Sequence, residues 1–165
     1  MKVIFLDCDG VLNYKGCRAR SPKGYKGISD VKLKLLKEIV DATAARIVLI
    51  STWKNGWEKD RSRITDEDTL YLLRKFRKHG LSVFDKTGEN AWMNRGQGIF
   101  SWLSFHKDVT EWVVLDDEFF SDYEEYGIME RLVKIDNPGE NGGGLQPEHV
   151  AKAIEVLNSA NFNKE

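Results

Sequence analysis

The chain of 165 residues has little of several features that would assign it to a specialised class of protein. Its two cysteines, Cys8 and Cys17, are too few for a disulfide framework, and neither has a metal-ligand partner at a suitable spacing. No apolar run approaches the roughly 20 residues of a membrane span. The N-terminus also lacks the basic and apolar regions of a signal peptide. We therefore expect a soluble protein of the reducing cytoplasm, without a membrane partner.

The chain also has little net charge. Its 25 lysines and arginines nearly balance its 26 aspartates and glutamates, so the whole molecule offers no electrostatic case for binding nucleic acid. The charges are nevertheless unevenly distributed. Residues 13–27 hold five basic residues and no acid, whereas residues 116–125 hold six acids and no base. The basic stretch is either a solvated loop or a positively charged flap beside a site for a phosphorylated substrate.

Two hydrophobic periodicities alternate along the chain. Runs of β-branched and aromatic residues predict five strands, at residues 3–6, 46–50, 81–84, 112–115 and 132–135. Between them, apolar residues at helical spacing predict helices that begin near Ser29, Thr65, Gly96 and Pro147. We expect the buried helix faces to include Val31, Leu70 and Phe100.

Strands separated by helices imply βαβ units. We therefore predict an α/β, Rossmann-like fold, with a mainly parallel five-stranded sheet and helices on both faces. The length suits one sizeable core, and no stretch resembles a linker, so we expect a single domain over residues 1–165. The segment between the first strand and the first helix is a flap of about 15 residues (13–27), which leaves no room for a large cap domain.

The first predicted strand is followed directly by acidic residues. Residues 3–6 run directly into Asp7 and Asp9, and Gly10 begins a turn. In open α/β sheets, ligands bind at the carboxyl ends of the strands. Two carboxylates this close repel each other unless a cation or a proton lies between them, so the arrangement indicates a metal-assisted site. By strand alternation, Cys8 should point away from both acids into the core.

The string Asp-x-Asp-Gly-Val-Leu at residues 7–12 resembles the first motif of the haloacid dehalogenase (HAD) superfamily. Most members of this superfamily are Mg²⁺-dependent phosphohydrolases. Ser51, directly after the second strand, matches the phosphate-binding Ser or Thr of the second motif, and Thr52 is the adjacent alternative. Asp116 and Asp117 match the acids of the fourth motif, which hold Mg²⁺.

The third motif of the superfamily supplies a cation that stabilises the nucleophile and the transferring phosphate. Arg95, just ahead of a predicted helix, suits this role better than the competing candidate, Lys86. The resemblance covers nearly the whole chain. A looser local similarity is to the small HAD domains associated with nucleic-acid repair, akin to polynucleotide 3′-phosphatase domains.

The resemblance also implies a role for each acid. Asp7 would attack phosphorus and form an aspartyl-phosphate, while Asp9 would protonate the leaving oxygen and later take a proton from the hydrolytic water. Asp7, the backbone carbonyl of Asp9 and Asp116 would bind Mg²⁺, with Asp117 helping directly or through water. The sequence therefore predicts a Mg²⁺-dependent phosphatase.

The substrate is predicted from the surroundings of these motifs. An uncapped site admits a polymer end, basic flap residues attract phosphates, and Trp53 and Trp57 can stack on a base if they are not core residues. We therefore hypothesise that the substrate is a phosphorylated nucleic-acid end or a nucleotide. A small phosphorylated metabolite is one alternative, because the acidic stretch after Asp117 would repel a polyanion. A non-catalytic module that binds a phosphorylated ligand or a partner is another.

Other conspicuous residues have plainer interpretations. We expect Trp92, Trp102 and Trp112 to pack in the core or at its margin. The glycine run at residues 142–144 lacks the Lys-Ser/Thr of a P-loop, so we interpret the surrounding segment as a mobile loop at the rim of the site.

Overall fold

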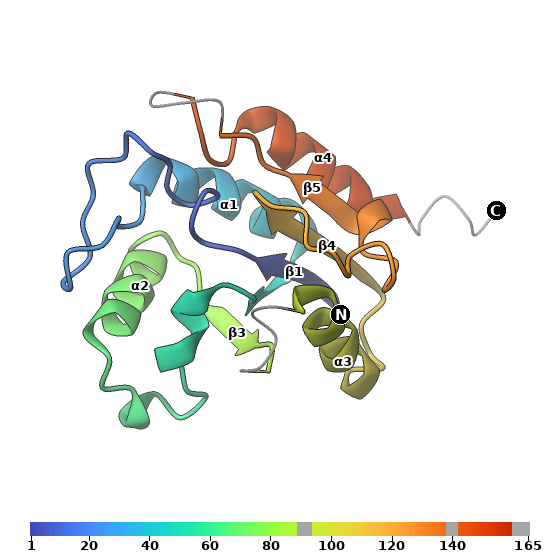
Figure 1. The fold of residues 1–165 in the computed structure, drawn as a ribbon, viewed down its shortest axis with the longest axis horizontal. Coiled ribbons are helices and arrows are strands. Elements are labelled where there is room, and N and C mark those ends of the chain that lie inside the picture. The colour runs from blue at the N-terminus through green and yellow to red at the C-terminus, as the bar shows by residue number, and fades with distance from the viewer. Residues whose placement is uncertain (89–93, 138–141, 160–165) are drawn as a thin grey trace.

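The computed structural model describes residues 1–88, 94–137 and 142–159. Five strands form one sheet in the order β3-β2-β1-β4-β5, and each pair of neighbours is parallel (Figure 1). The strands are β1 (Lys2–Leu6), β2 (Arg46–Leu49), β3 (Val83–Lys86), β4 (Glu111–Asp116) and β5 (Leu132–Lys134). The predicted α/β, Rossmann-like fold and its five strands are confirmed.

The helices begin near the predicted positions. The α-helices are α1 (Asp30–Thr43), α2 (Glu67–Lys78), α3 (Arg95–Phe105) and α4 (Pro147–Asn158). Short 3₁₀ helices are η1 (Thr52–Gly56), η2 (Arg61–Arg63) and η4 (Met129–Arg131). Asp66, next to the predicted start of α2 at Thr65, acts as its cap, because its carboxylate accepts a hydrogen bond from the backbone N–H of Thr69 at 2.8 Å. None of these helices is long and apolar enough to cross a membrane.

Alternate residues of the strands point into two separate cores, one on each face of the sheet. On one face, α1, α2 and α4 pack against side chains such as Leu6 and Leu49. On the other, α3 and the segment after β4 pack against Phe5 and Val48. Figure 1 shows α1 and α4 side by side on their face of the sheet and α3 away from them. Both faces are therefore covered, as the sequence predicts.

Three residues predicted to lie in the core are exposed instead. The exposed fractions are 62 % for Val31, 36 % for Leu70 and 54 % for Phe100. Each stands two residues before a fully or nearly buried apolar residue of the same helix, which places it about 200° around the helix axis from the core. The apolar spacing thus identified the helices correctly but assigned too wide a buried face to them.

The tryptophans predicted to pack in the core or at its margin do so where the structure describes them. Trp102 is buried, and its indole N–H donates to Asp85 at 2.9 Å. Trp112 is half-buried at the edge of the same core. Trp92 lies outside the described residues, as does the middle of the predicted rim loop, residues 138–141.

An ionic contact joins α1 to α2 directly after the flap. Asp30, the first residue of α1, accepts a hydrogen bond from Lys75 at 2.7 Å and contacts Nε2 of His79 at 2.6 Å. These hydrogen bonds to the charged form hold the pKa of Asp30 well below its usual range. The contact thus fixes the end of the flap relative to α2.

We predict that Asp30→Asn lowers the free energy of unfolding at neutral pH by about 1 kcal/mol or less, because the carboxylate is partly exposed and screened. Since the folded-state pKa is lowered, this stabilisation is fully present above the unfolded pKa of about 3.9 and is lost progressively as the pH falls from there through the lowered folded-state pKa. Urea denaturation at pH 7, 5, 3.5 and 2 measures this change, with Asp41→Asn on the same helix as the control. A difference from wild type that stays undiminished at pH 2 would contradict the assignment.

Candidate active site

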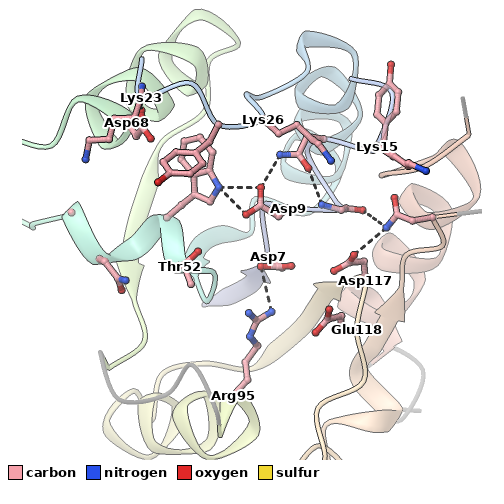
Figure 2. Close-up of a pocket in the computed structure, with 18 of the residues that line it drawn as sticks. Asp7, Asp9, Lys15, Lys23, Lys26, Thr52, Asp68, Arg95, Asp117 and Glu118 are labelled. Atoms are coloured by element: carbon pink, nitrogen blue, oxygen red, sulfur yellow. Dashed lines mark hydrogen bonds and ion pairs between the residues drawn. The ribbon is translucent and has the colours of Figure 1, made fainter. Parts of the chain in front are cut away.

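A pocket of about 870 Å³ opens where the carboxyl ends of β1, β2 and β4 meet (Figure 2). Residues that follow these three strands line it, as do the start of α3 and the flap. The predicted site residues among the lining are Asp7, Asp9, Thr52, Arg95 and Asp117. The topology therefore brings residues from distant parts of the sequence to one cavity, at the edge of the sheet where open α/β folds bind ligands.

Three carboxylates gather at the base of this pocket. Oxygens of Asp7, Asp116 and Asp117 lie within 4.8 Å of one another, and we call these residues the acid cluster. Asp7 follows β1 directly, and its backbone N–H donates to the carbonyl of Leu115 on β4 at 2.9 Å, which fixes its position in the sheet. The oxygen-rich set suits a hard divalent cation such as Mg²⁺.

Arg95 lies against the acid cluster (Figure 2). Its Nη1 is 2.7 Å from Oδ2 of Asp116 and 3.3 Å from Oδ1 of Asp7. Burial alone would lower the pKa of Arg95, but the two carboxylates outweigh that effect and raise it. Arg95 therefore stays charged and neutralises part of the cluster.

This neutralisation is incomplete. Burial raises the pKa of Asp7 well above its usual value, and the charges of Asp116 and Asp117 raise it further against the opposing effect of Arg95. Burial and Asp116 likewise raise the pKa of Asp117. Acids in such surroundings take up a proton or bind a cation. The electrostatics of the cluster therefore favour a metal ion, and so does its geometry.

Asp116 is the most completely bound member of the cluster. It is fully buried, and besides Arg95 it accepts hydrogen bonds from the hydroxyl of Tyr123 at 2.6 Å and from the backbone N–H of Glu118 at 3.0 Å. Burial and the charge of Asp116 raise the pKa of Tyr123, so the phenol remains a donor. The sequence interpretation did not single out Tyr123, because nothing in its local pattern distinguishes it from an ordinary core aromatic residue.

Asp117 is held by the loop after β5. Nδ2 of Asn137 lies 3.1 Å from Oδ2 of Asp117 and 3.0 Å from the carbonyl oxygen of Gly10, and the backbone N–H of Gly144 donates to Oδ1 of Asn137 at 3.0 Å. Gly10 has φ +78°, and a Cβ there would lie 2.0 Å from Oδ2 of Asp117. The turn after Asp9 therefore requires glycine on both conformational and steric grounds. Asn137 is a further site residue that the sequence interpretation missed.

The carboxylate of Asp9 is placed differently from the cluster. It belongs to an exposed residue and accepts hydrogen bonds from Nδ2 of Asn13 at 2.8 Å and from the indole N–H of Trp53, which is 3.3 Å from both oxygens. Its side chain is not part of the acid cluster found among the described residues. Asp9 thus lines the same pocket with a carboxylate that lies outside the acid cluster.

The structure separates the two candidates for the second motif. Ser51 is 1 % exposed, and its hydroxyl accepts a hydrogen bond from the backbone N–H of Trp53 at the start of η1. Thr52, which the sequence interpretation gave as the alternative, lines the pocket (Figure 2). Of the two candidates, Thr52 is therefore the one found among the described residues that line the pocket.

The candidates for the third motif are separated in the same way. Arg95 is the first residue of α3 and lines the pocket. Lys86 lies at the end of β3, with its Nζ 3.4 Å from the carbonyl oxygen of Lys54, and is not among the described residues that line the pocket. Cys8 is fully buried in the core as predicted, and burial raises the pKa of its thiol, which keeps it protonated and makes it a poor nucleophile.

The flap folds against α2. Lys23 forms an ion pair with Asp66, its backbone N–H donates to Asp68 at 3.1 Å, and the hydroxyl of Tyr71 accepts a hydrogen bond from the backbone N–H of Ile28 at 3.1 Å. The flap residues that line the pocket are Asn13, Tyr14, Lys15, Lys23, Tyr25 and Lys26. The basic stretch is therefore one wall of the site and not a loop remote from it.

We predict that Arg95→Met in the presence of EDTA lowers the free energy of unfolding by about 3–5 kcal/mol at pH 8, because it leaves buried carboxylates uncompensated. The pKa of Asp7 is already raised in the folded state, so proton uptake should reduce the loss at pH 5.5. Denaturant unfolding at both pH values measures the effect. Arg131→Met, which removes the more exposed partner of Glu111, is the control. A loss of equal size at both pH values would show that Arg95 does not balance the acid cluster.

The geometry of the pocket agrees with a comparison against known protein families. A family model described as the HAD domain in Swiss Army Knife RNA repair proteins matches residues 3–150. This segment runs from β1 to the first turn of α4 and contains all the described residues that line the pocket. Comparisons with curated proteins and with solved structures found no significant match. The chain therefore belongs to the family of HAD domains in Swiss Army Knife RNA repair proteins.

Proposed function

We propose that this protein is a Mg²⁺-dependent phosphatase that acts through an aspartyl-phosphate on the terminal phosphates of nucleic acids or on nucleotides. The observation that carries the proposal is the acid cluster with Arg95 against it, at the base of a pocket that also holds the carboxylate of Asp9. Membership of a HAD family supports a hydrolase-type function, and the family description supports a nucleic-acid substrate.

The acid cluster and the backbone carbonyl of Asp9 are the groups that would hold Mg²⁺. When bound, the ion would neutralise charge on the carboxylates and on the phosphoryl oxygens. The raised pKa values of Asp7 and Asp117 support this assignment, because burial and neighbouring carboxylates disfavour their charged forms, which a cation would stabilise. HAD proteins in general use Mg²⁺, which agrees with the hard oxygen donors of the cluster.

Asp7 is the proposed nucleophile. Its carboxylate lies at the base of the pocket with one oxygen 3.3 Å from Arg95. Attack would form a bond between a carboxylate oxygen and phosphorus and break the bond from phosphorus to the ester oxygen. Arg95 and the hydroxyl of Thr52 would bind the non-bridging oxygens, on which negative charge is spread during transfer.

Asp9 is the proposed general acid and base. In the first step it would give its proton to the leaving ester oxygen, so that the product leaves as an alcohol. In the second step it would take a proton from the water that attacks phosphorus, which releases inorganic phosphate and restores the Asp7 carboxylate. Its placement beside the acid cluster, but outside it, suits this exchange of protons.

The flap wall supports a nucleotide or polynucleotide substrate. Lys15 and Lys26 line the pocket from the flap, with Tyr25 beside them and Trp53 on the side of η1. Cationic side chains bind phosphates irrespective of base sequence, and aromatic faces stack on any base. The pocket is also lined by three acids that would repel phosphates, namely Asp66, Asp68 and Glu118. These acids favour a strand end over a duplex lying across the whole site.

We predict that wild type hydrolyses p-nitrophenyl phosphate with Mg²⁺ and that EDTA abolishes this activity. Asp7→Asn should reduce turnover to background, because an amide is a poor nucleophile and a weaker metal ligand. Asp9→Asn should slow turnover by about 10²–10⁴-fold and accumulate acid-stable label from ³²P-labelled substrate. Asp68→Asn removes an acid of the same pocket outside the cluster and should retain most activity. Absence of Mg²⁺-dependent turnover on a broad phosphoester panel would instead favour a non-catalytic binding module.

We predict that Lys15→Gln/Lys26→Gln lowers kcat/KM for a 3′-phosphorylated oligonucleotide by about tenfold at low salt, with the loss shrinking as salt rises. Hydrolysis of p-nitrophenyl phosphate should change far less, because that substrate does not extend to the flap. The control Arg18→Gln/Lys34→Gln removes the same charge from exposed residues outside the described lining of the pocket. Equal losses on both substrates would make the flap a structural lid, and a preference for small phosphate esters would favour a metabolite phosphatase.

A further inference from the structure

Two side chains from different parts of the chain hold the carboxylate of Asp9. Nδ2 of Asn13 donates to its Oδ1 at 2.8 Å, and Oδ1 of Asn13 in turn accepts from the backbone N–H of Gly10 at 2.9 Å. From η1, the indole Nε1 of Trp53 is 3.3 Å from both oxygens of the carboxylate. Because the indole N–H is a single donor that faces both oxygens equally, it restricts the orientation of the carboxylate plane.

Trp53 is itself well supported. Its backbone N–H donates to the hydroxyl of Ser51 at 3.1 Å, and its ring contacts the ring of Tyr71 with centroids 6.4 Å apart. The hydroxyl of Tyr71 accepts the backbone N–H of Ile28, where the flap ends. The indole is thus fixed between η1, α2 and the end of the flap, so its N–H can serve as a rigid reference for a side chain on an exposed turn.

We propose that Trp53 is a positioning residue that acts through Asp9, by holding its carboxylate in the orientation needed to protonate the leaving oxygen. The inference rests on the proposed function, since it assumes that Asp9 exchanges protons with the reacting groups. One oxygen of Asp9 would carry the proton to be transferred while the other keeps the indole hydrogen bond. An exposed carboxylate without this contact would spend less time within reach of the ester oxygen, and proton transfer would slow.

The test uses the dependence of kcat/KM on the leaving group. This parameter includes the steps up to formation of the aspartyl-phosphate, in which only a poor leaving group needs a proton from Asp9. Trp53→Phe should lower kcat/KM for alkyl phosphates by about tenfold, the size expected for loss of one hydrogen bond to a charged group. The same change should lower kcat/KM for p-nitrophenyl phosphate less than about threefold, because p-nitrophenolate leaves without a proton.

A double-mutant cycle shows whether the effect passes through Asp9. In an Asp9→Asn background, Trp53→Phe should change kcat/KM for alkyl phosphates by less than about twofold, because residues that act as a unit are not additive. A role of Trp53 in the fold or in binding the substrate would instead persist in that background. A persistent loss, or equal losses for both leaving groups, would overturn the proposal.

Two further variants distinguish the loss of the indole hydrogen bond from an effect of misfolding. Trp57→Phe alters a tryptophan of the same segment that is buried in the core and has no hydrogen bond to Asp9 among the described contacts, and it should leave the leaving-group dependence unchanged. If Trp53→Phe unfolds, β-(3-benzothienyl)alanine at position 53 keeps the bicyclic shape without the N–H and serves in its place. If wild type itself shows no Mg²⁺-dependent turnover, or Asp7→Asn retains it, the proposed function fails and not the positioning role alone.

Discussion

The arrangement of the site depends on the repulsion among three carboxylates held within 4.8 Å of one another. The parallel sheet imposes this proximity, because β1 and β4 are neighbours in register, Asp7 directly follows β1, and β4 ends at Asp116 with Asp117 after it. Arg95, Tyr123 and the backbone of Glu118 offset the charge of Asp116 from within the protein. Asp7 and Asp117 keep raised pKa values in spite of these partners. The fold thus maintains a concentration of negative charge that a divalent cation would relieve.

Hydrogen bonds and ion pairs place the carboxylates of Asp7 and Asp9 in different surroundings. Asp7 and Asp9 are separated by one residue, yet Asp7 faces Arg95 at the base of the pocket, whereas Asp9 turns to Asn13 and Trp53. The turn at Gly10 makes this possible, since its φ of +78° redirects the chain directly after Asp9. One carboxylate therefore lies within the acid cluster, and the other lies outside it, as the proposed role of Asp9 in proton transfer requires.

The sequence predicted the elements of the fold and the acids of the site, because both depend on local patterns. Strand ends coincide with Asp7 and Asp116, and the α/β alternation places those ends together. Tyr123 and Asn137 could not be found in this way, since each becomes a site residue only through a contact with a neighbouring loop. Local patterns likewise could not predict which of Ser51 and Thr52 would line the pocket. Adjacent hydroxyls after a strand have equal local signals, and η1 decides which of them is buried.

The number of basic residues in the flap overstates the positive charge that the flap presents to the pocket. The sequence contains five basic residues there, but Lys23 is paired with Asp66, and Arg20 donates to the carbonyls of Cys17 and Ala19 within the flap. These contacts hold the shape of the flap and its attachment to α2. The basic flap residues that line the pocket are Lys15, Lys23 and Lys26, and they are the ones that a bound phosphate chain would meet. A short stretch of cationic wall opposite acidic side chains suits recognition of the last few phosphates of a strand better than strong binding along its length.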